Sequence, residues 1–140
     1  MNVAFFLTPK TDVIYEKITN TMRQAIERME YHTYTAIPIL DDCGRYVGTL
    51  TEGDLLWKLK NTPNLDFKNT SKVLLSDIYM HTKIAPVHIN GNIEDLVEVA
   101  ISQNFVPVVD DDNIFIGIIK RSDIMSYCYE KLFKKIEETA

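Results

Sequence analysis

The sequence has 140 residues, of which 46% are hydrophobic and 25% charged, and these values are typical of one globular domain. A net charge of −5 argues against a nucleic-acid surface, which normally needs a basic patch. No apolar stretch approaches the ~20 residues that span a bilayer, so we expect neither nucleic acid nor membrane among its partners. Cys43 and Cys128 lack metal-ligand spacing and predict free thiols in a cytoplasmic protein.

The first 32 residues predict a lead segment, a short extended run and one helix. Val3–Leu7 is too short for a signal peptide, and we expect it to pack on the body of the protein. Val13–Tyr15 is the extended run. Thr21 and Gln24 have the spacing of a capping box, so a helix should begin there and end near His32.

A β-hairpin and a second helix should follow. The short apolar run Ala36–Leu40 predicts a buried strand, the acidic residues after it predict a turn, and Tyr46–Leu50 predicts the returning strand. Thr51 is well placed to cap the next helix, with Asp54 at its third position.

The second half of the chain begins after a connector. Residues 61–71 contain a proline and asparagines without periodicity, which is typical of a loop. Lys72–Met80 predicts a short helix, and Ala85–His88 repeats the extended run. Asn92 can cap the helix that follows.

The chain closes with a second hairpin and a long helix. Val106–Val109 and Ile114–Ile119 predict the two strands, and the final helix should run from about Ser122 to Glu138. The charged end of this helix predicts a segment that projects beyond the body.

Landmarks of the first half recur in the second half at a constant offset of 69, and they are Pro38 with Pro107, Gly48 with Gly117, and Asp54 with Asp123. Each half is too small to bury a good core alone, so the halves should pack together as one pseudo-symmetric body with a cleft between them. The preceding helices align better at an offset of 71. Because the loop after the helix is therefore shorter in the second half, the two potential sites should not be equivalent.

This order of elements resembles the CBS domain, named after cystathionine β-synthase. Two copies in tandem resemble a CBS pair of the stand-alone bacterial type, and the resemblance covers essentially the whole chain. It implies an α/β (α+β) fold of two β-α-β-β-α units, each a small sheet packed by two helices. We expect the first unit with its lead segment in residues 1–60, the connector in 61–71, and the second unit with the closing helix in 72–140.

The resemblance also implies two nucleotide sites, one for each half. In the first, Thr35, Ala36 and Ile37 would surround the base, while Thr51 and Asp54 would contact the sugar. A carboxylate in the first turn of a helix can accept hydrogen bonds from both hydroxyls of a ribose. The same two residues could instead serve only as a helix cap.

In the second site, Phe105 and Val106 would surround the base and Asp123 would bind the sugar. Lys120 stands where the family pattern has Thr, and Arg121 follows it. Both cations would suit a phosphate near the helix N-terminus. They could equally be solvated surface charges, and Asp123 could be only a cap.

The function that the resemblance implies is regulatory. Such pairs bind AMP, ADP, ATP or cyclic di-AMP between their halves and signal by changing a dimer or partner-binding surface. We expect a homodimer through the helices, with Trp57 as an anchor, and an effector protein as a further partner. The alternative is a ligand-free dimeric scaffold. We expect no enzyme, cofactor or metal, because the sequence has no phosphate loop, zinc motif or catalytic triad motif.

Overall fold

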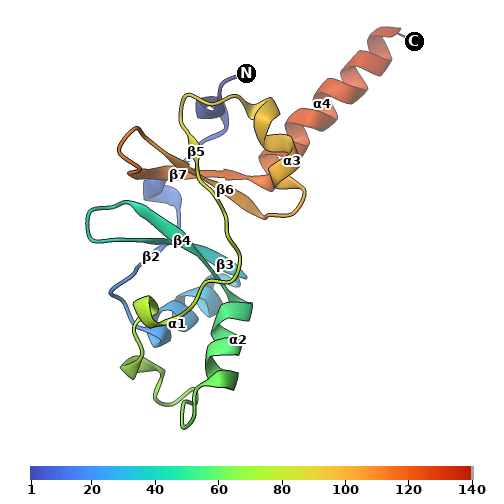
Figure 1. Ribbon diagram of the computed structural model, residues 1–140. Coiled ribbons are helices and arrows are strands. Elements are labelled where there is room, and N and C mark those ends of the chain that lie inside the picture. The colour runs from blue at the N-terminus through green and yellow to red at the C-terminus, as the bar shows by residue number, and fades with distance from the viewer. Residues whose placement is uncertain (140) are drawn as a thin grey trace.

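The computed structural model describes residues 1–139 as an α+β fold with two small sheets (Figure 1). The first sheet has the order β2-β3-β4, and its strands are Glu16–Lys17, Ala36–Leu40 and Tyr46–Thr51. The second sheet has the order β1-β7-β6-β5, and its strands are Thr8–Pro9, Phe115–Lys120, Phe105–Val109 and Val87–His88. Both predicted hairpins are confirmed, as β3-β4 and β6-β7.

The two long helices of the first unit begin at the predicted caps. Helix α1 spans Met22–His32, and Thr21 and Gln24 form the complete capping box. Helix α2 spans Glu52–Asn61, and Thr51 and Asp54 form a second complete box. Each box satisfies backbone N–H groups that a helix end leaves without partners.

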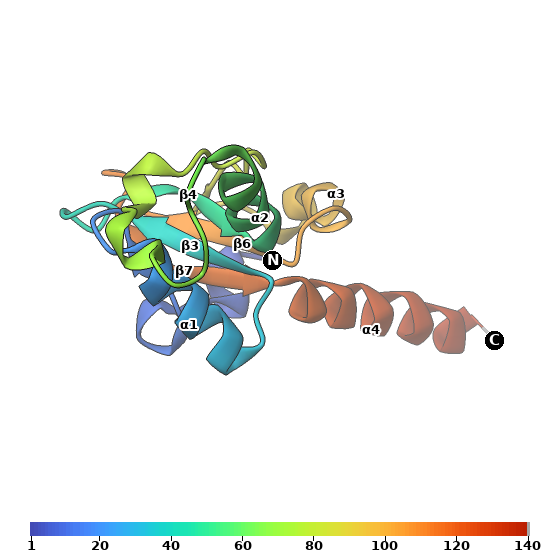
Figure 2. The same ribbon diagram turned by 90° about the horizontal axis from the view of Figure 1, so that it is seen from below.

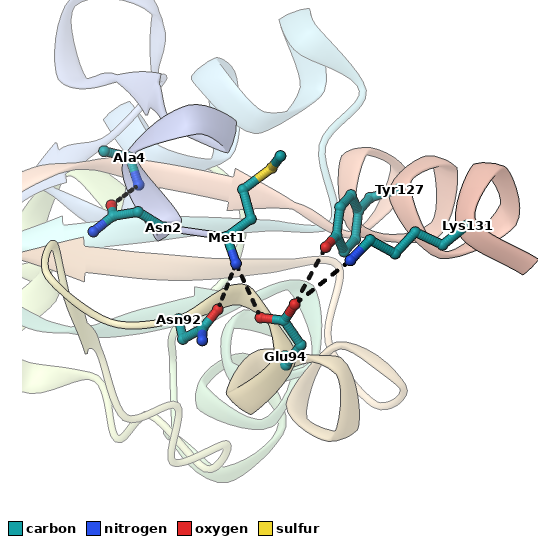
Figure 3. A network of polar contacts seen from close by, with 7 residues as sticks. All are labelled: Met1, Asn2, Ala4, Asn92, Glu94, Tyr127 and Lys131. Atoms are coloured by element: carbon teal, nitrogen blue, oxygen red, sulfur yellow. Dashed lines mark hydrogen bonds and ion pairs between the residues drawn. The ribbon is translucent and has the colours of Figure 1, made fainter.

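The second unit keeps the order of elements but has a much weaker first helix. A 3₁₀ turn, η5 (Ile93–Leu96), leads into the single turn of α3 (Val97–Ala100). The predicted cap by Asn92 is wrong, because its side chain caps no N–H of this helix. Instead, Asn92 Oδ1 accepts a hydrogen bond from the Met1 ammonium at 3.1 Å (Figure 3).

Several short 3₁₀ turns join the main elements. They are η1 (Val3–Phe6), η2 (Lys10–Asp12), η3 (Thr70–Lys72) and η4 (Leu75–Asp77). The single helix predicted over residues 72–80 is therefore replaced by two short turns. Its apolar side chains do reach the core, since Leu75 and Ile78 are buried against the first unit.

The segments expected at residues 1–60, 61–71 and 72–140 do not pack as separate bodies. Parts of the chain from one expected segment complete the core of another. The lead segment joins the second unit, where Val3 is fully buried and β1 pairs antiparallel with β7. The Met1 ammonium also lies 3.4 Å from Glu94, whose carboxylate accepts a hydrogen bond from Tyr127 (Figure 3). Each unit thus completes its core with a segment that the sequence places next to the other unit.

The hairpins of the two units meet edge to edge. The Tyr46 N–H donates to the Asn113 carbonyl at 3.2 Å, and the Phe115 N–H donates to the Gly44 carbonyl at 2.9 Å. Tyr46 and Phe115 are buried together between the sheets, with Val13, Leu40 and Val109 around them. This cluster fixes the two units relative to one another.

Helix α4 (Arg121–Thr139) projects from the body in both views (Figures 1 and 2). It has 19 residues, whereas its counterpart α2 has 10. The expected projecting end is confirmed. Among residues 1–139, no helix combines the length and apolar character that a membrane crossing requires.

We predict that Gly117→Ala destabilises the protein by about 2–4 kcal/mol. A Cβ at Gly117 would lie 2.1 Å from the Thr8 carbonyl oxygen, so β1 would have to leave the sheet edge. Urea unfolding measures the loss. Gly53→Ala is the matched control, because a Cβ there meets only ordinary contacts at 3.7 Å and a helical Gly→Ala change stabilises by about 0.5–1 kcal/mol. Equal effects of the two substitutions would contradict the close packing of β1.

Candidate functional site

Two hollows lie where the units meet. Hollow A has a volume of about 330 Å³ and is lined by Thr8, Asp12, Val13, Ile14, Thr33, Tyr34, Thr35, Ala36, Pro38, Asn104, Phe105, Ile118 and Lys120. Hollow B has a volume of about 270 Å³ and is lined by Thr35, Ala36, Thr51, Glu52, Thr82, Ile84, Ser102, Gln103, Asn104 and Phe105. Each hollow has walls from both units, as the repeat predicts.

Residues at equivalent positions of the two repeats lie between the two hollows. Thr35 with Ala36 and Asn104 with Phe105 line both of them, and the Asn104 amide donates to Thr35 Oγ1 at 3.2 Å. These residues precede the strand prolines of the two units, so their backbone groups lie at the ends of β3 and β6. The Thr35 carbonyl accepts a hydrogen bond from the Glu52 N–H at 3.0 Å, and the Asn104 carbonyl accepts one from the Arg121 N–H at 2.9 Å. Each carbonyl has a second lone pair, which can accept a further hydrogen bond from the edge of a planar ligand.

The predicted site residues regroup between the halves. Thr35 and Ala36 share hollow A with Lys120, which the sequence assigns to the other site. Thr51 shares hollow B with Phe105 instead. Each hollow therefore combines the strand start of one unit with the strand end of the other, because the residues before β3 and β6 meet through the hydrogen bond from the Asn104 amide to Thr35.

Asp54 lies in neither hollow. Its side chain is 1% exposed, and its carboxylate accepts hydrogen bonds from the Thr51 N–H at 2.9 Å and from the His81 N–H at 2.9 Å. The His81 ring nitrogen Nδ1 lies 2.8 Å from the same carboxylate. The interpretation of Asp54 as a helix cap is thus confirmed, and in this structure protein groups occupy the oxygens that a sugar would need.

Asp123, the equivalent residue of the second unit, is exposed in the first turn of α4. It lines a surface groove of about 520 Å³ together with Thr8, and Thr8 also lines hollow A. The groove that contains Asp123 and hollow A thus share Thr8, and the Asp123 side chain is open to solvent. The repeated aspartates consequently differ in what they can bind.

Three other predicted site residues point elsewhere. The Arg121 guanidinium donates to the Gln103 carbonyl at 2.7 Å and to Asn104 Oδ1 at 2.9 Å, so it holds the loop before β6 instead of facing hollow A. Ile37 and Val106 are fully buried in the cores of their units and line neither hollow. Strand alternation explains their position, because successive side chains point to opposite faces.

The structure adds residues that the sequence did not assign to a site. Val13 and Ile14 give hollow A an apolar wall. Tyr34 lines the same hollow and stacks on His32 with a centroid distance of 5.4 Å. The extended run at residues 13–15 was a usable signal, since its counterpart in the second half, Ala85–His88, directly follows Ile84, which lines hollow B.

A wider and shallower hollow of about 590 Å³ lies over α1. All of its lining residues belong to the first unit, and its charged groups pair with protein partners. Arg28 lies 3.5 Å from the buried Glu16, and Glu27 pairs with Arg23 at 3.0 Å. It therefore lacks the shared walls and the unpaired cation of hollow A. In the described part of the chain, no three His, Cys, Asp or Glu side chains cluster as a metal site would require.

The profile of the CBS domain matches residues 6–61 and again residues 75–130, and the chain belongs to this family. The two matches correspond to the two units of the fold. The resemblance inferred from the repeated landmarks is confirmed.

Curated relatives have similar organisation. The cyclic di-AMP receptor B of Bacillus subtilis (strain 168) is 25% identical over 123 residues, which cover 88% of this chain and 83% of that protein. The chloroplastic CBS domain-containing protein CBSX1 of Arabidopsis thaliana is 25% identical over 147 residues. The match covers 88% of this chain but only 62% of the Arabidopsis protein.

Solved structures share the fold. A crystal structure of CbpB in complex with c-di-AMP superposes with a TM-score of 0.83 at 21% identity, covering 99% of this chain and 91% of that one. A crystal structure of CBSX2 in complex with AMP gives a TM-score of 0.73 at 24% identity, covering 92% of this chain and 96% of that one.

We predict that Asp54→Ala lowers the free energy of unfolding by about 1–3 kcal/mol, because the cap is lost and two backbone N–H groups lose their acceptor. Asp123→Ala should cost less than about 1 kcal/mol, because the exposed carboxylate contributes only its interaction with the helix dipole. Urea unfolding of both variants measures the difference. Losses of equal size would mean that Asp54 is not the structural member of the pair.

Proposed function

We propose that the chain is a regulatory module that binds an adenine nucleotide in hollow A. The observation that carries this proposal is the composition of the hollow, which combines an apolar wall, backbone groups at two strand starts and one lysine. Its volume of about 330 Å³ lies within the range of small-molecule sites. The names of two similar proteins support the ligand class, since one is a receptor for cyclic di-AMP and another was crystallised with AMP.

In this proposal each part of the nucleotide meets a different group of residues. The adenine ring packs against Val13, Ile14 and Ala36, where backbone groups can bond its edge. The ribose hydroxyls meet Asp123 at the mouth of the hollow. Lys120 is the cation nearest the phosphate, and it acts as a point charge without the fork geometry of arginine. In this proposal the first unit supplies the wall that contacts the base. The second unit supplies the groups that bind the sugar and the phosphate.

The signal follows from differential affinity. A nucleotide that contacts both units favours the arrangement in which they close on it, and this changes the surface shown to a partner copy or an effector protein. This mode of action needs neither a catalytic group nor a cofactor, and it suits a cytoplasmic protein. Mononucleotides and cyclic di-AMP remain the competing ligands.

Two observations favour the alternative of a ligand-free scaffold. The apolar side chains of α4 are exposed along its length, and Asp54 is engaged by the protein itself. A scaffold would bind no nucleotide, so ligand binding separates the two functions.

We predict that AMP or cyclic di-AMP raises the melting temperature of the parent protein. A ligand present at 100 times its dissociation constant adds about 2.7 kcal/mol to the stability. Asp123→Ala should weaken AMP binding about tenfold or more, and Lys120→Ala should weaken it to a similar degree, because each removes a charged partner of the ligand. Calorimetric titration with AMP, ADP, ATP and cyclic di-AMP measures the affinities.

Lys134→Ala is the control for Lys120→Ala, since Lys134 is an exposed lysine on the projecting part of α4. The affinity of the Lys134→Ala variant for AMP should equal that of the parent protein. If no nucleotide of the panel binds the parent protein, the scaffold function replaces the proposed one.

We further propose a homodimer formed through the helices. On α2, Leu56 and Trp57 are 56% and 43% exposed, and on α4 the exposed apolar residues are Met125, Tyr129, Leu132, Phe133 and Ile136. The α4 residues recur at helical spacing and form one stripe. Faces of this kind are typical of interfaces, in which large apolar and aromatic side chains carry most of the binding energy.

Light scattering at micromolar concentration should give the mass of a dimer. Leu132→Glu should reduce it to a monomer, because a charge would be buried in the apolar interface. Phe67→Glu is the matched control, since Phe67 is also an exposed apolar residue but lies in the connector. A parent protein that scatters as a monomer would overturn this interface.

A further inference from the structure

Arg121, the first residue of α4, is held to the residues before β6 by three hydrogen bonds. Its backbone N–H donates to the Asn104 carbonyl at 2.9 Å. Its half-buried side chain donates through Nε to the Gln103 carbonyl at 2.7 Å and through Nη2 to Asn104 Oδ1 at 2.9 Å. Because the planar guanidinium engages both acceptors at once, it fixes the Asn104 side chain more firmly than a single contact would.

The side-chain amide of Asn104 therefore has one direction. An arginine side chain can only donate, so the end of the amide that faces Arg121 is the oxygen. The other end, Nδ2, lies 3.2 Å from Thr35 Oγ1. An amide nitrogen also only donates, so Thr35 Oγ1 is the acceptor of this hydrogen bond. The protons of both contacts thus point from α4 toward Thr35.

This order of donors leaves the hydroxyl proton of Thr35 free. The proton cannot point at Asn104, because the lone pair of Oγ1 is needed there. Among residues 1–139, the contact with Asn104 is the single hydrogen bond of this hydroxyl. Thr35 is exposed and lines hollow A, so its proton is available to a ligand in that hollow.

The strand starts consequently offer an acceptor beside a donor. The acceptor is a carbonyl of Thr35 or Asn104, since each keeps one lone pair besides the hydrogen bond that it already accepts. The donor is the Thr35 hydroxyl. Adenine carries an amino donor next to a ring-nitrogen acceptor on one edge, whereas hypoxanthine carries an oxygen acceptor next to an N–H donor. The two protein groups therefore match adenine and mismatch hypoxanthine.

We propose that Arg121 and Asn104 are positioning residues, which keep the Thr35 hydroxyl proton available to an acceptor atom of the ligand in hollow A. The inference rests on the proposed function, because it concerns the same site. It replaces the expectation that Arg121 contacts a phosphate, since its guanidinium is engaged within the protein. The effect of Arg121 reaches the ligand through two neutral side chains.

Calorimetric titration with AMP and IMP tests the proposal. The parent should bind AMP about tenfold or more tightly than IMP, because the mismatched edge leaves polar groups unpaired. Asn104→Asp keeps an acceptor for Arg121, but its second carboxylate oxygen would accept the Thr35 hydroxyl proton. The preference for AMP over IMP should then fall about tenfold, through weaker AMP binding. The two nucleotides carry the same charge, so the added carboxylate affects both equally.

Two further variants separate this effect from a general disturbance of the site. Ser102→Asp is the matched control, since it adds the same charge at an exposed position of the same loop and should leave the preference at the parental value. Thr35→Val removes the hydroxyl and should weaken AMP and IMP together, because the hydroxyl can donate to one base and accept from the other. Equal preferences in the Asn104→Asp and Ser102→Asp variants would overturn the proposal.

Thermal unfolding tests the contact of Arg121 with Asn104 without a ligand. The fall in melting temperature of the double variant Arg121→Met with Asn104→Ala should be smaller than the sum of the falls of the single variants, because both remove the same hydrogen bond. Additive falls would mean that Arg121 does not fix Asn104, and the proposal would be wrong. Failure of every nucleotide to bind the parent would instead overturn the proposed function and this role in binding with it, whatever the melting temperatures.

Discussion

The edge-to-edge contact of the two hairpins determines the rest of the structure. Backbone hydrogen bonds join the turn at Gly44 to the strand at Phe115, and the buried pair Tyr46 and Phe115 fills the space behind them. Both hollows depend on this contact, because each takes walls from both units. The contact also stabilises the fold, because each unit is too small to bury a sufficient hydrophobic core alone. The geometry of the two hollows and the stability of the fold therefore rest on one interface.

The repeated glycines mark where a distant segment crosses each hairpin. Gly117 allows β1 to approach within a distance that a side chain would forbid, and Gly48 does the same for Met80. An added Cβ would meet different groups at the two positions. At Gly117 it would meet backbone, whereas at Gly48 it would meet the flexible end of a methionine side chain. The same repeat position therefore carries a rigid contact in one unit and an adaptable contact in the other.

Local signals allowed most of the fold to be predicted from the sequence. The capping boxes at Thr21 and Thr51 and the two hairpins are short-range features, and they form as expected. Asn92 fails as a cap because a group 91 residues away competes for its side chain. For the same reason the site was only partly predictable. Asp54 matched the pattern of a ligand-binding residue, but only the tertiary structure brings His81 to it.

The exchange of segments between the units means that neither half of this chain is self-sufficient. A fragment ending at residue 60 would lack Leu75 and Ile78, which close the first core, and a fragment starting at residue 72 would lack Val3 and the edge strand of the second. Each fragment would expose apolar surface that only the other could cover. Duplication has thus produced a protein whose ancestral modules are no longer separable, although their sequences still align.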